Sequence, residues 1–335
     1  MNDMTCGVLE MLREGDGYLS GELFSERLGI SRAAVWKHVR QLRNAGYRIE
    51  GLPRRGYRLL SSPDLPSEME IRPWLETGVL GRRILFYEEV ESTNDVASEL
   101  AYDGEPEGTT VTADRQTAGR GRMDRSWISP SGTNIYASVI LRPAVSPWKA
   151  PQMSIVAVTA LVRAVEEAAH GVHLGIKWPN DVLCSGRKLA GILCELHSDL
   201  DRVHHLVVGM GINVNMAEMG EELEGRATSL LIETGRETSR ARLAGVLLNS
   251  LEETYAAWLD RGIGEFVPFW EERSVLTGCR VDIDTPSGSL CGTVRGLSPS
   301  GALELETSAG SVMEVLSGDV HISSVRERRT KVRGQ

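Results

Sequence analysis

Residues 115–127, which read RQTAGRGRMDRSW, contain the densest group of residue types that could bind an anion. Arg120, Arg122 and Arg125 alternate with glycine, and each glycine costs about 1 kcal/mol of helix propensity, so the stretch predicts a loop. Bare amides in such loops form concave phosphate sites, and arginine adds a planar, permanently charged fork of donors. The stretch therefore predicts a mobile loop that folds over an anion, with a solvated basic loop as the alternative.

Small polar side chains end the strand predicted at 84–93, where Ser92, Thr93 and Asn94 follow one another. They suit a compact polar ligand, and ordinary capping of the next helix is the alternative. Lys188 opens the otherwise apolar strand LAGILCEL. A lysine that enters a strand bound for the core is costly unless a negative charge meets it, and an exposed strand end is the alternative.

Two further groups of polar residues lie beside structural breaks. Lys177, Asn180 and Asp181 flank a Trp-Pro pair, and the strand predicted at 204–216 ends in GMGIN, which includes Asn213 and two glycines that let backbone approach a ligand. GMGIN lacks the third glycine and the following helix of a dinucleotide-binding turn. The sequence also contains no GxxxxGK[ST], which excludes a P-loop.

The composition indicates a soluble protein of two or three domains. The chain has 335 residues and a net charge of −9, and no stretch approaches the ~18 apolar residues of a membrane span. Five scattered cysteines, never in CxxC spacing, predict reduced thiols rather than disulfides or a zinc site. Together with the absence of a signal pattern at the N-terminus, these features predict a cytoplasmic location.

Residues 1–62 predict a winged helix-turn-helix. This part has a net charge of +3, whereas the remainder has −12, and a basic head on an acidic body is typical of a nucleic-acid-binding module. Glu22–Leu28 fits a helix with Leu23 and Leu28 facing inward, and a second helix begins after Ser31, with Val35, Val39 and Leu42 as its core stripe. A small protein-interaction module is the alternative. The DNA-contacting residues predicted on the second helix and on the wing are Arg32, Trp36, Lys37, Arg40, Arg54 and Arg55.

The rest of the chain predicts an α+β body and a small β-domain. Strands at 84–93, 108–116 and 134–143, a hairpin at 174–195 and amphipathic helices at 150–169 and 238–259 predict a central mixed β-sheet with helices. Five short strands from Val275 onward predict an SH3-like barrel. The predicted domains are 1–62, 63–272 and 273–324, followed by a basic tail at 325–335.

Four motifs, in this order and spacing, give the chain a family resemblance. GRGRMDRSW, KWPND at 177–181, RKLAGIL at 187–193 and GxGINV at 209–214 resemble the biotin–protein ligases, and the winged helix in front of them resembles the bifunctional ligases that also repress the biotin operon. The resemblance covers nearly all of residues 8–323. It implies a class II synthetase-like central domain that activates biotin with ATP and Mg²⁺ as biotinyl-AMP.

The resemblance also implies roles for the polar residues. Lys188, Arg120 and Arg122 would be catalytic, because the reaction brings two anions together and needs neutralisation and alignment rather than a nucleophile. Asp181 would meet Mg²⁺, and Lys177 would meet phosphate. The full set implied for biotin and nucleotide is Ser92, Thr93, Asn94, Gln116, Gly119, Arg120, Gly121, Arg122, Trp127, Lys177, Asn180, Asp181, Lys188, Gly191 and Asn213.

The resemblance implies three partners: a lysine of a biotin carboxyl carrier protein of acetyl-CoA carboxylase, operator DNA of biotin genes, and a second copy of the chain when biotinyl-AMP is bound. No membrane partner is implied. One departure concerns the barrel, where Ser323 stands in place of an expected arginine, with Arg326 nearby and Asp319 keeping its acidic character. The alternatives are a lipoate or acyl-acid ligase, a biotin-sensing repressor without catalysis, and a ligase whose head regulates nothing.

Overall fold

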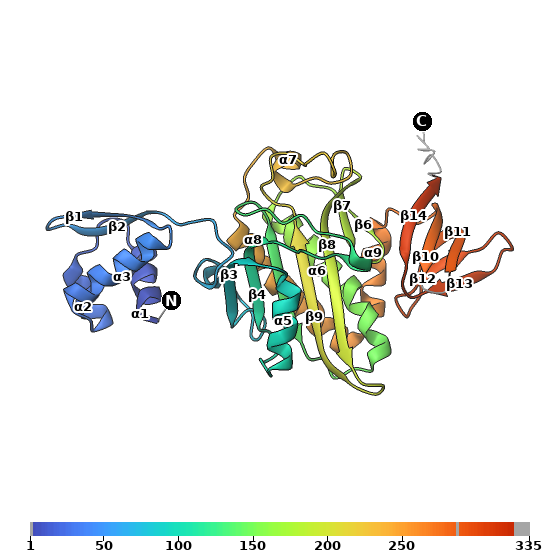
Figure 1. Cartoon of the computed structure of the whole chain (residues 1–335), viewed down its shortest axis with the longest axis horizontal. Coiled ribbons are helices and arrows are strands. Elements are labelled where there is room, and N and C mark those ends of the chain that lie inside the picture. Colours follow the sequence, from blue (N-terminus) through green and yellow to red (C-terminus); the bar gives the residue numbers. More distant parts are fainter. Residues whose placement is uncertain (1–2, 286–287, 325–335) are drawn as a thin grey trace, which may run out of the picture. The chain divides into compact units, whose positions relative to one another are not determined.

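The structure is a computed structural model that describes residues 3–285 and 288–324 (Figure 1). The basic tail predicted at 325–335 lies outside the described residues. Contacts divide the chain into two compact units, Met1–Leu65 and Pro66–Gln335. The predicted division between a central domain at 63–272 and a C-terminal domain at 273–324 stays a prediction.

The first unit is a three-helix bundle with a two-stranded wing, as predicted. Its helices and strands are α1 (Asp3–Glu14), α2 (Gly21–Leu28), α3 (Arg32–Asn44), β1 (Arg48–Leu52) and β2 (Gly56–Ser61). Ser20 and Ser31 cap α2 and α3 by accepting hydrogen bonds from the amides of Leu23 and Ala34. Gly29 ends α2 in the left-handed conformation, so the short turn between the helices follows directly from local sequence.

The core of this unit differs in one respect from the prediction. Val35, Val39 and Leu42 are buried as expected. In α2, however, Phe24 is the fully buried side chain, whereas Leu23 and Leu28 are only half-buried. Phe24 packs edge-on against Tyr57 of the wing, with the ring centroids 6.4 Å apart.

A seven-stranded mixed sheet forms the centre of the second unit (Figure 1). Its strands stand in the order β3-β4-β5-β9-β8-β7-β6; only β3 and β4 run parallel. Their bounds are β3 (Ile84–Val90), β4 (Thr110–Gln116), β5 (Ile135–Leu141), β6 (Leu174–Lys177), β7 (Asp181–Cys184), β8 (Arg187–Ser198) and β9 (Val203–Ile212). The hairpin predicted at 174–195 therefore contains three strands, because the chain also turns at Trp178-Pro179.

Helices cover both faces of this sheet. Helix α5 (Thr93–Tyr102) packs on β4, β5 and β9, where Ile140 and Val207 face it. The opposite face holds the large core, in which α6 (Met153–Ala168) lies against α8 (Arg240–Arg261). The short helical segments of this unit are α4 (Glu68–Ile71), η1 (Arg72–Trp74), η2 (Arg122–Asp124), η3 (Pro147–Gln152), α7 (Leu230–Thr234), η4 (Ile263–Glu265) and α9 (Val267–Arg273).

The last five strands form an antiparallel sheet in the order β13-β12-β11-β10-β14, consistent with the predicted SH3-like domain. They are β10 (Arg280–Thr285), β11 (Gly288–Leu297), β12 (Leu303–Glu306), β13 (Val312–Val315) and β14 (Asp319–Ser324). Alternating residues such as Val281, Ile283 and Leu305 are fully buried, which is the two-residue period expected of such strands. The start of β14 carries Asp319, which lines the pocket described next.

Candidate active site

A pocket of about 200 Å³ lies where the segment 117–134 between β4 and β5 folds over β8 and β9. Its lining comes from eight separate parts of the chain. The lining residues are Ser92, Thr93, Asn94, Gln116, Arg120, Gly121, Arg122, Met123, Arg125, Ser126, Trp127, Tyr136, Asn180, Asp181, Lys188, Gly191, Ile192, Leu193, Gly209, Met210, Gly211, Leu223 and Asp319.

One end of the pocket is a network of neutral hydrogen-bonding groups. Gln116 accepts from the Thr93 amide at 2.8 Å, and Ser138 donates to Asn94 Oδ1 at 2.6 Å. Asn94 lies directly over Gly209, where any Cβ would collide with its amide oxygen. Helix α5 begins at Thr93, yet Ser92 makes no side-chain capping bond, so simple capping does not explain all three small polar residues.

The guanidinium groups of the loop lie against carboxylates of the chain. Arg120 is ion-paired with Asp95 of α5 and with Glu195 of β8, the latter at 3.0 Å. Burial opposes the charge on Arg120, but these two carboxylates outweigh it and raise the pKa of the guanidinium. The Glu195 carboxylate also accepts from Asn94 Nδ2 at 2.7 Å. Glu195 therefore connects the cationic loop to the neutral end of the pocket.

Two other loop arginines reach the last strand of the chain. Arg122 donates to the Gly318 carbonyl at 3.2 Å and lies 3.4 Å from Asn180 Oδ1. Arg125 forms an ion pair with Asp319 at the start of β14. Although burial alone raises the pKa of the Asp319 carboxyl, its bond with Arg125 lowers that pKa overall. The loop is thus held at its tip by the C-terminal strand.

Lys188 lines the pocket beside Asp181 and Trp127. Its Nζ lies 2.7 Å from Asp181 Oδ1 and 5.3 Å from the centre of the Trp127 ring. A negative charge therefore meets this lysine, as its place at the start of an apolar strand required. Trp127 packs so closely on Gly211 that a Cβ there would come within 2.6 Å of the ring. Its buried indole N–H has no hydrogen-bond partner among the described residues.

The chemistry of the donor set is compatible with magnesium at one residue. Asp181 Oδ1 is buried and, despite its ion pair with Lys188, makes no aligned hydrogen bond. Magnesium is commonly held by one or two carboxylates together with phosphate oxygens and water. Within residues 3–285 and 288–324, no group of three metal-ligating side chains occurs, so any metal here would depend on the substrate for most of its ligands.

Three of the fifteen residues implied for biotin and nucleotide do not line the pocket. Gly119 lies at the base of the loop, where a Cβ would come within 2.5 Å of the Trp127 carbonyl. Asn213 is buried, and its side chain donates to the Thr228 carbonyl at 3.0 Å and accepts from Asn134 Nδ2 at 3.5 Å, so its bonds are made outside the pocket lining. Lys177 pairs with Asp181 in the β6–β7 register, beside the pocket rather than in it.

Sequence reasoning missed several residues that shape the pocket. Tyr136 lines it and donates to the Pro130 carbonyl at 3.0 Å, and Ser138 binds both Thr93 and Asn94. Both residues lie in β5, where their alternation with apolar residues was the available signal. Asp95 and Glu195 gave no signal, because carboxylates on a helix and on a strand are ordinary surface residues until the fold brings Arg120 to them.

The first unit carries the residues predicted to contact DNA on its exposed surface. Trp36 is 52% exposed, and Arg40 lies over its ring at 5.5 Å. Arg32 is exposed but ion-paired with Glu22, and Lys37 is exposed on the same helix, α3. In the wing, Arg54 occupies the turn between β1 and β2 with a φ of 64°. Arg55, in the same turn, lies over the ring of Tyr18 at 4.5 Å.

Comparisons with known proteins agree with this arrangement. Residues 86–213 match the biotin/lipoate A/B protein ligase family, and residues 8–58 match a helix-turn-helix domain. The bifunctional ligase/repressor BirA of Bacillus subtilis is 40% identical over 92% of this chain and 95% of its own length. The protein of the same description from Escherichia coli is 30% identical over 97% of this chain and 99% of its own.

A solved structure resembles a large part of this chain in fold. The biotin protein ligase of Aquifex aeolicus, in complex with biotin and ATP, superposes with a TM-score of 0.63 at 31% identity. The match covers 72% of this chain and all of that one. Among the described residues, every helix is too short or too polar to cross a membrane.

Proposed function

This chain belongs to the family of bifunctional biotin–protein ligases and biotin repressors, and we propose from that membership that it attaches biotin to a carrier-protein lysine and represses transcription. The ligase half uses ATP and biotin, the two ligands named for the Aquifex aeolicus relative. The observation that carries the proposal is the pocket itself, in which Lys188 and the loop arginines face a neutral hydrogen-bonding network.

In the first half-reaction, an oxygen of the biotin carboxylate attacks the α-phosphorus of ATP. A bond forms between this oxygen and phosphorus, and the bond to the bridging oxygen breaks, so that pyrophosphate leaves with the electron pair. Both reactants are anions, and catalysis consists of neutralising and aligning them. We assign this role to Lys188, Arg120 and Arg122, which line the pocket.

The neutral end of the pocket would bind the biotin head group. Amide and hydroxyl groups of Thr93, Asn94 and Gln116 offer both donors and acceptors there, and Ser92 lies next to them. A site built of such groups discriminates against acids that lack the matching hydrogen-bonding atoms, because its own polar groups would be left unpaired. A lipoyl chain lacks the ureido group, so this end favours biotin over lipoate.

In the second half-reaction, the carrier lysine attacks the acyl carbon of biotinyl-AMP. An amide bond forms, the bond between the acyl carbon and the phosphate oxygen breaks, AMP leaves, and the ammonium proton is released to solvent. The loop would shield the mixed anhydride from water until the lysine arrives. Its tip contacts with Gly318 and Asp319 support this closing role.

Several finer assignments belong to the same proposal. Mg²⁺ would meet Asp181 and the phosphates, and Lys177 would lie near the phosphates. The carrier would be the biotin carboxyl carrier of acetyl-CoA carboxylase, and biotinyl-AMP would favour a homodimer on the operator of biotin genes. The described cysteines are all free, which supports a cytoplasmic location.

ATP–pyrophosphate exchange tests the enzymatic half. Purified protein is assayed with biotin, with lipoate or with no added acid, and exchange that depends on biotin is expected. Exchange with lipoate alone would move the protein to a lipoate ligase. Tight binding of biotin without any exchange would mean a sensor that lacks the chemistry.

A further inference from the structure

We infer that Arg240, which does not line the pocket, is a positioning residue that clamps the base of the glycine–arginine loop through Asp114. The inference rests on the proposed function for its catalytic consequences, but not for its structural ones. Arg240 is the first residue of α8 and is 1% exposed, one of the largest fully buried side chains described. It lies 126 residues away from Asp114 in sequence.

The ion pair is buried on both sides. Nη1 of Arg240 lies 2.8 Å from Asp114 Oδ1, and the two side chains are 2% and 12% exposed. Burial alone raises the pKa of the Asp114 carboxyl, but hydrogen bonds from Ser131 and Arg240 lower it overall. A buried pair is weak evidence for stability by itself, because desolvation offsets much of the attraction. The burial of the Arg240–Asp114 pair is therefore better explained by the loop segment that Asp114 binds.

Asp114 holds the segment that returns from the loop. It accepts a hydrogen bond from the Ser131 hydroxyl and another from the Gly132 amide at 3.1 Å. Gln116 stands two residues further along β4, on the same face of the strand, and donates to Ser129 Oγ at 2.9 Å. Asp114 and Gln116 of β4 thus bind the end of the loop segment at two successive points, Ser131–Gly132 and Ser129. Arg240 neutralises the charge of Asp114.

Arg240 also contacts the backbone at Asn134, just before β5. The same Nη1 lies 3.2 Å from the Asn134 carbonyl oxygen. Asn134 is fully buried and accepts from the Val214 amide at 2.9 Å, next to Asn213. The backbone N–H of Asn213 in turn donates at 3.0 Å to the carbonyl of Leu189, the residue after Lys188. The guanidinium therefore contacts the loop base directly, and it is connected to the strand that carries Lys188 only through the bonds of Asn134 and Asn213.

Without the Arg240–Asp114 pair, the base of the glycine–arginine loop would be less restrained and the loop tip would sample more positions. Arg120, Arg122 and Arg125 have their partners on α5, β8 and β14, and each partner is correctly placed only when the loop leaves β4 at a fixed angle. The biotin-head contacts through Asn94 and Ser138 do not pass through this clamp. Losing the clamp should therefore impair neutralisation of the phosphates and retention of biotinyl-AMP more than recognition of biotin.

The experiment compares two variants with wild type and with a control. Ser131→Ala removes one loop-base bond and leaves the ion pair in place. The double variant Asp114→Asn/Arg240→Gln removes both charges, so that neither is left buried alone. Arg142→Gln is the matched control, because Arg142 also binds backbone carbonyls, of Ala101, Glu105 and His204, but at the other end of β5.

The first readout is independent of catalysis. Trypsin cleaves after arginine, and cleavage at Arg120, Arg122 and Arg125 reports how often the loop opens. We expect cleavage within 117–134 to be faster by roughly 10-fold in the double variant and by a few-fold in Ser131→Ala. The rate in Arg142→Gln should equal that of wild type. Equal rates in all four folded proteins would overturn the clamp, whatever reaction the protein catalyses.

The second readout is kinetic. In the double variant we expect the KM for ATP and the release of biotinyl-AMP in the absence of carrier to rise by roughly 10-fold, with the Kd for biotin changed by less than about threefold. Arg240→Lys with native Asp114 keeps a positive charge and should restore most of the loss. If the double variant and Arg142→Gln lose kcat and biotin affinity in the same proportion, Asp114 and Arg240 have a purely structural role. Wild type without biotin-dependent exchange would overturn the proposed function, while proteolysis still decides the clamp.

Discussion

At the scale of single residues, the pocket balances three of its four lining cations against carboxylates of the chain, and Arg122 is the exception. Arg120 faces Asp95 and Glu195, Lys188 faces Asp181, and Arg125 faces Asp319. An anionic substrate must therefore displace or share a resident carboxylate, and its affinity is a difference between two sets of contacts. Substitutions on the acidic side should consequently strengthen binding, and substitutions on the basic side should weaken it.

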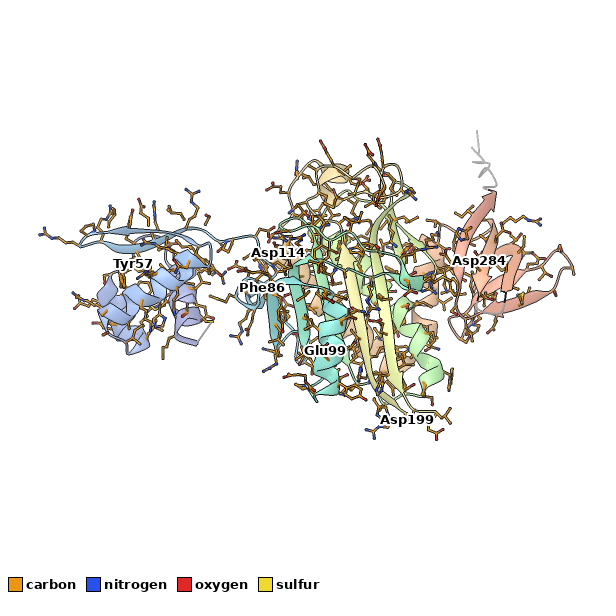
Figure 2. The ribbon with its side chains drawn as sticks, in the orientation of Figure 1. Tyr57, Phe86, Glu99, Asp114, Asp199 and Asp284 are labelled. Carbon is orange, nitrogen blue, oxygen red and sulfur yellow. The ribbon has the colours of Figure 1, made fainter. Side chains whose placement is uncertain are left out.

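Replacing Asp95 by Asn tests the acidic side. Asp95 is half-exposed and competes with an incoming anion for Arg120, and exposed pairs of this kind contribute about 0–1 kcal/mol. We expect Asp95→Asn to tighten ATP binding by up to about fivefold at low ionic strength, with the gain shrinking as salt screens the charges. Isothermal titration at two salt concentrations measures this change. The control is Glu99→Gln, an exposed acid on the same helix, α5 (Figure 2); weaker ATP binding in Asp95→Asn would contradict the competition.

Replacing Lys188 by Ala tests the basic side. In the proposed mechanism its ammonium stabilises charge that develops on the attacked phosphate, so its loss should lower kcat by roughly 100-fold or more. The Kd for biotin should change little, because the hydrogen-bonding end of the pocket is intact. Lys149→Ala, an exposed lysine next to Trp148, is the control. A variant that binds biotin poorly but turns over at the wild-type rate would refute the assignment.

At the scale of elements, the β8–β9 hairpin carries a cluster of three histidines at its end remote from the pocket. His197 stacks on His205 at 4.9 Å and lies 5.2 Å from His204, and His204 pairs with Asp199 at 2.8 Å. Figure 2 shows Asp199 and Asp114 at opposite ends of the central sheet. Tyr102 of α5 contacts His197. Acidification should therefore affect this end of the sheet without passing through the loop.

The direction in which stability changes with pH follows from the pKa of His205. Burial lowers it, and the positive charges that His197, Arg142 and His204 can carry lower it further. The unfolded chain thus protonates His205 more readily than the folded chain does. His205 therefore leaves the free energy of unfolding unchanged above about pH 6.5 and lowers it as the pH falls below that value. We expect the urea midpoint of wild type to fall between pH 7.5 and pH 5.5, and to fall less in His205→Phe. An equal fall in both proteins would show that other groups dominate.

Local patterns predicted the elements well because they depend on residues a few positions apart. The alternation in 134–143 and the stripe through Val35, Val39 and Leu42 both led to buried faces. The same reasoning failed where the partner is distant in sequence. It did not find that Phe24 packs on Tyr57, and no local pattern joins Arg240 to Asp114. The pocket's basic residues were predictable from motifs, but their acidic partners were not, since only the fold brings them together.

At the scale of the whole molecule, the chain joins a positively charged head to a negatively charged body, and the two units have different tasks. A head with exposed Trp36, Lys37 and Arg40 on α3 suits phosphate and groove contacts. One such head offers few contacts, whereas two heads in a dimer bind a two-fold site through effective concentration. If the proposed repression works through such a dimer, the ligand of the body must change dimerisation, and thermodynamic reciprocity then requires that DNA tightens ligand binding.

Operator affinity measured with and without biotin and ATP tests this coupling. We expect both ligands together to raise affinity by at least about 10-fold, a coupling of about 1.4 kcal/mol, while either ligand alone has little effect. Lys188→Ala separates the ligand from the chemistry, since it should respond to supplied biotinyl-AMP but not to biotin and ATP. Arg40→Ala should weaken binding in every state and flatten its salt dependence, because it removes a phosphate contact rather than the coupling. Equal wild-type affinity under all conditions would leave a ligase whose head does not sense biotin.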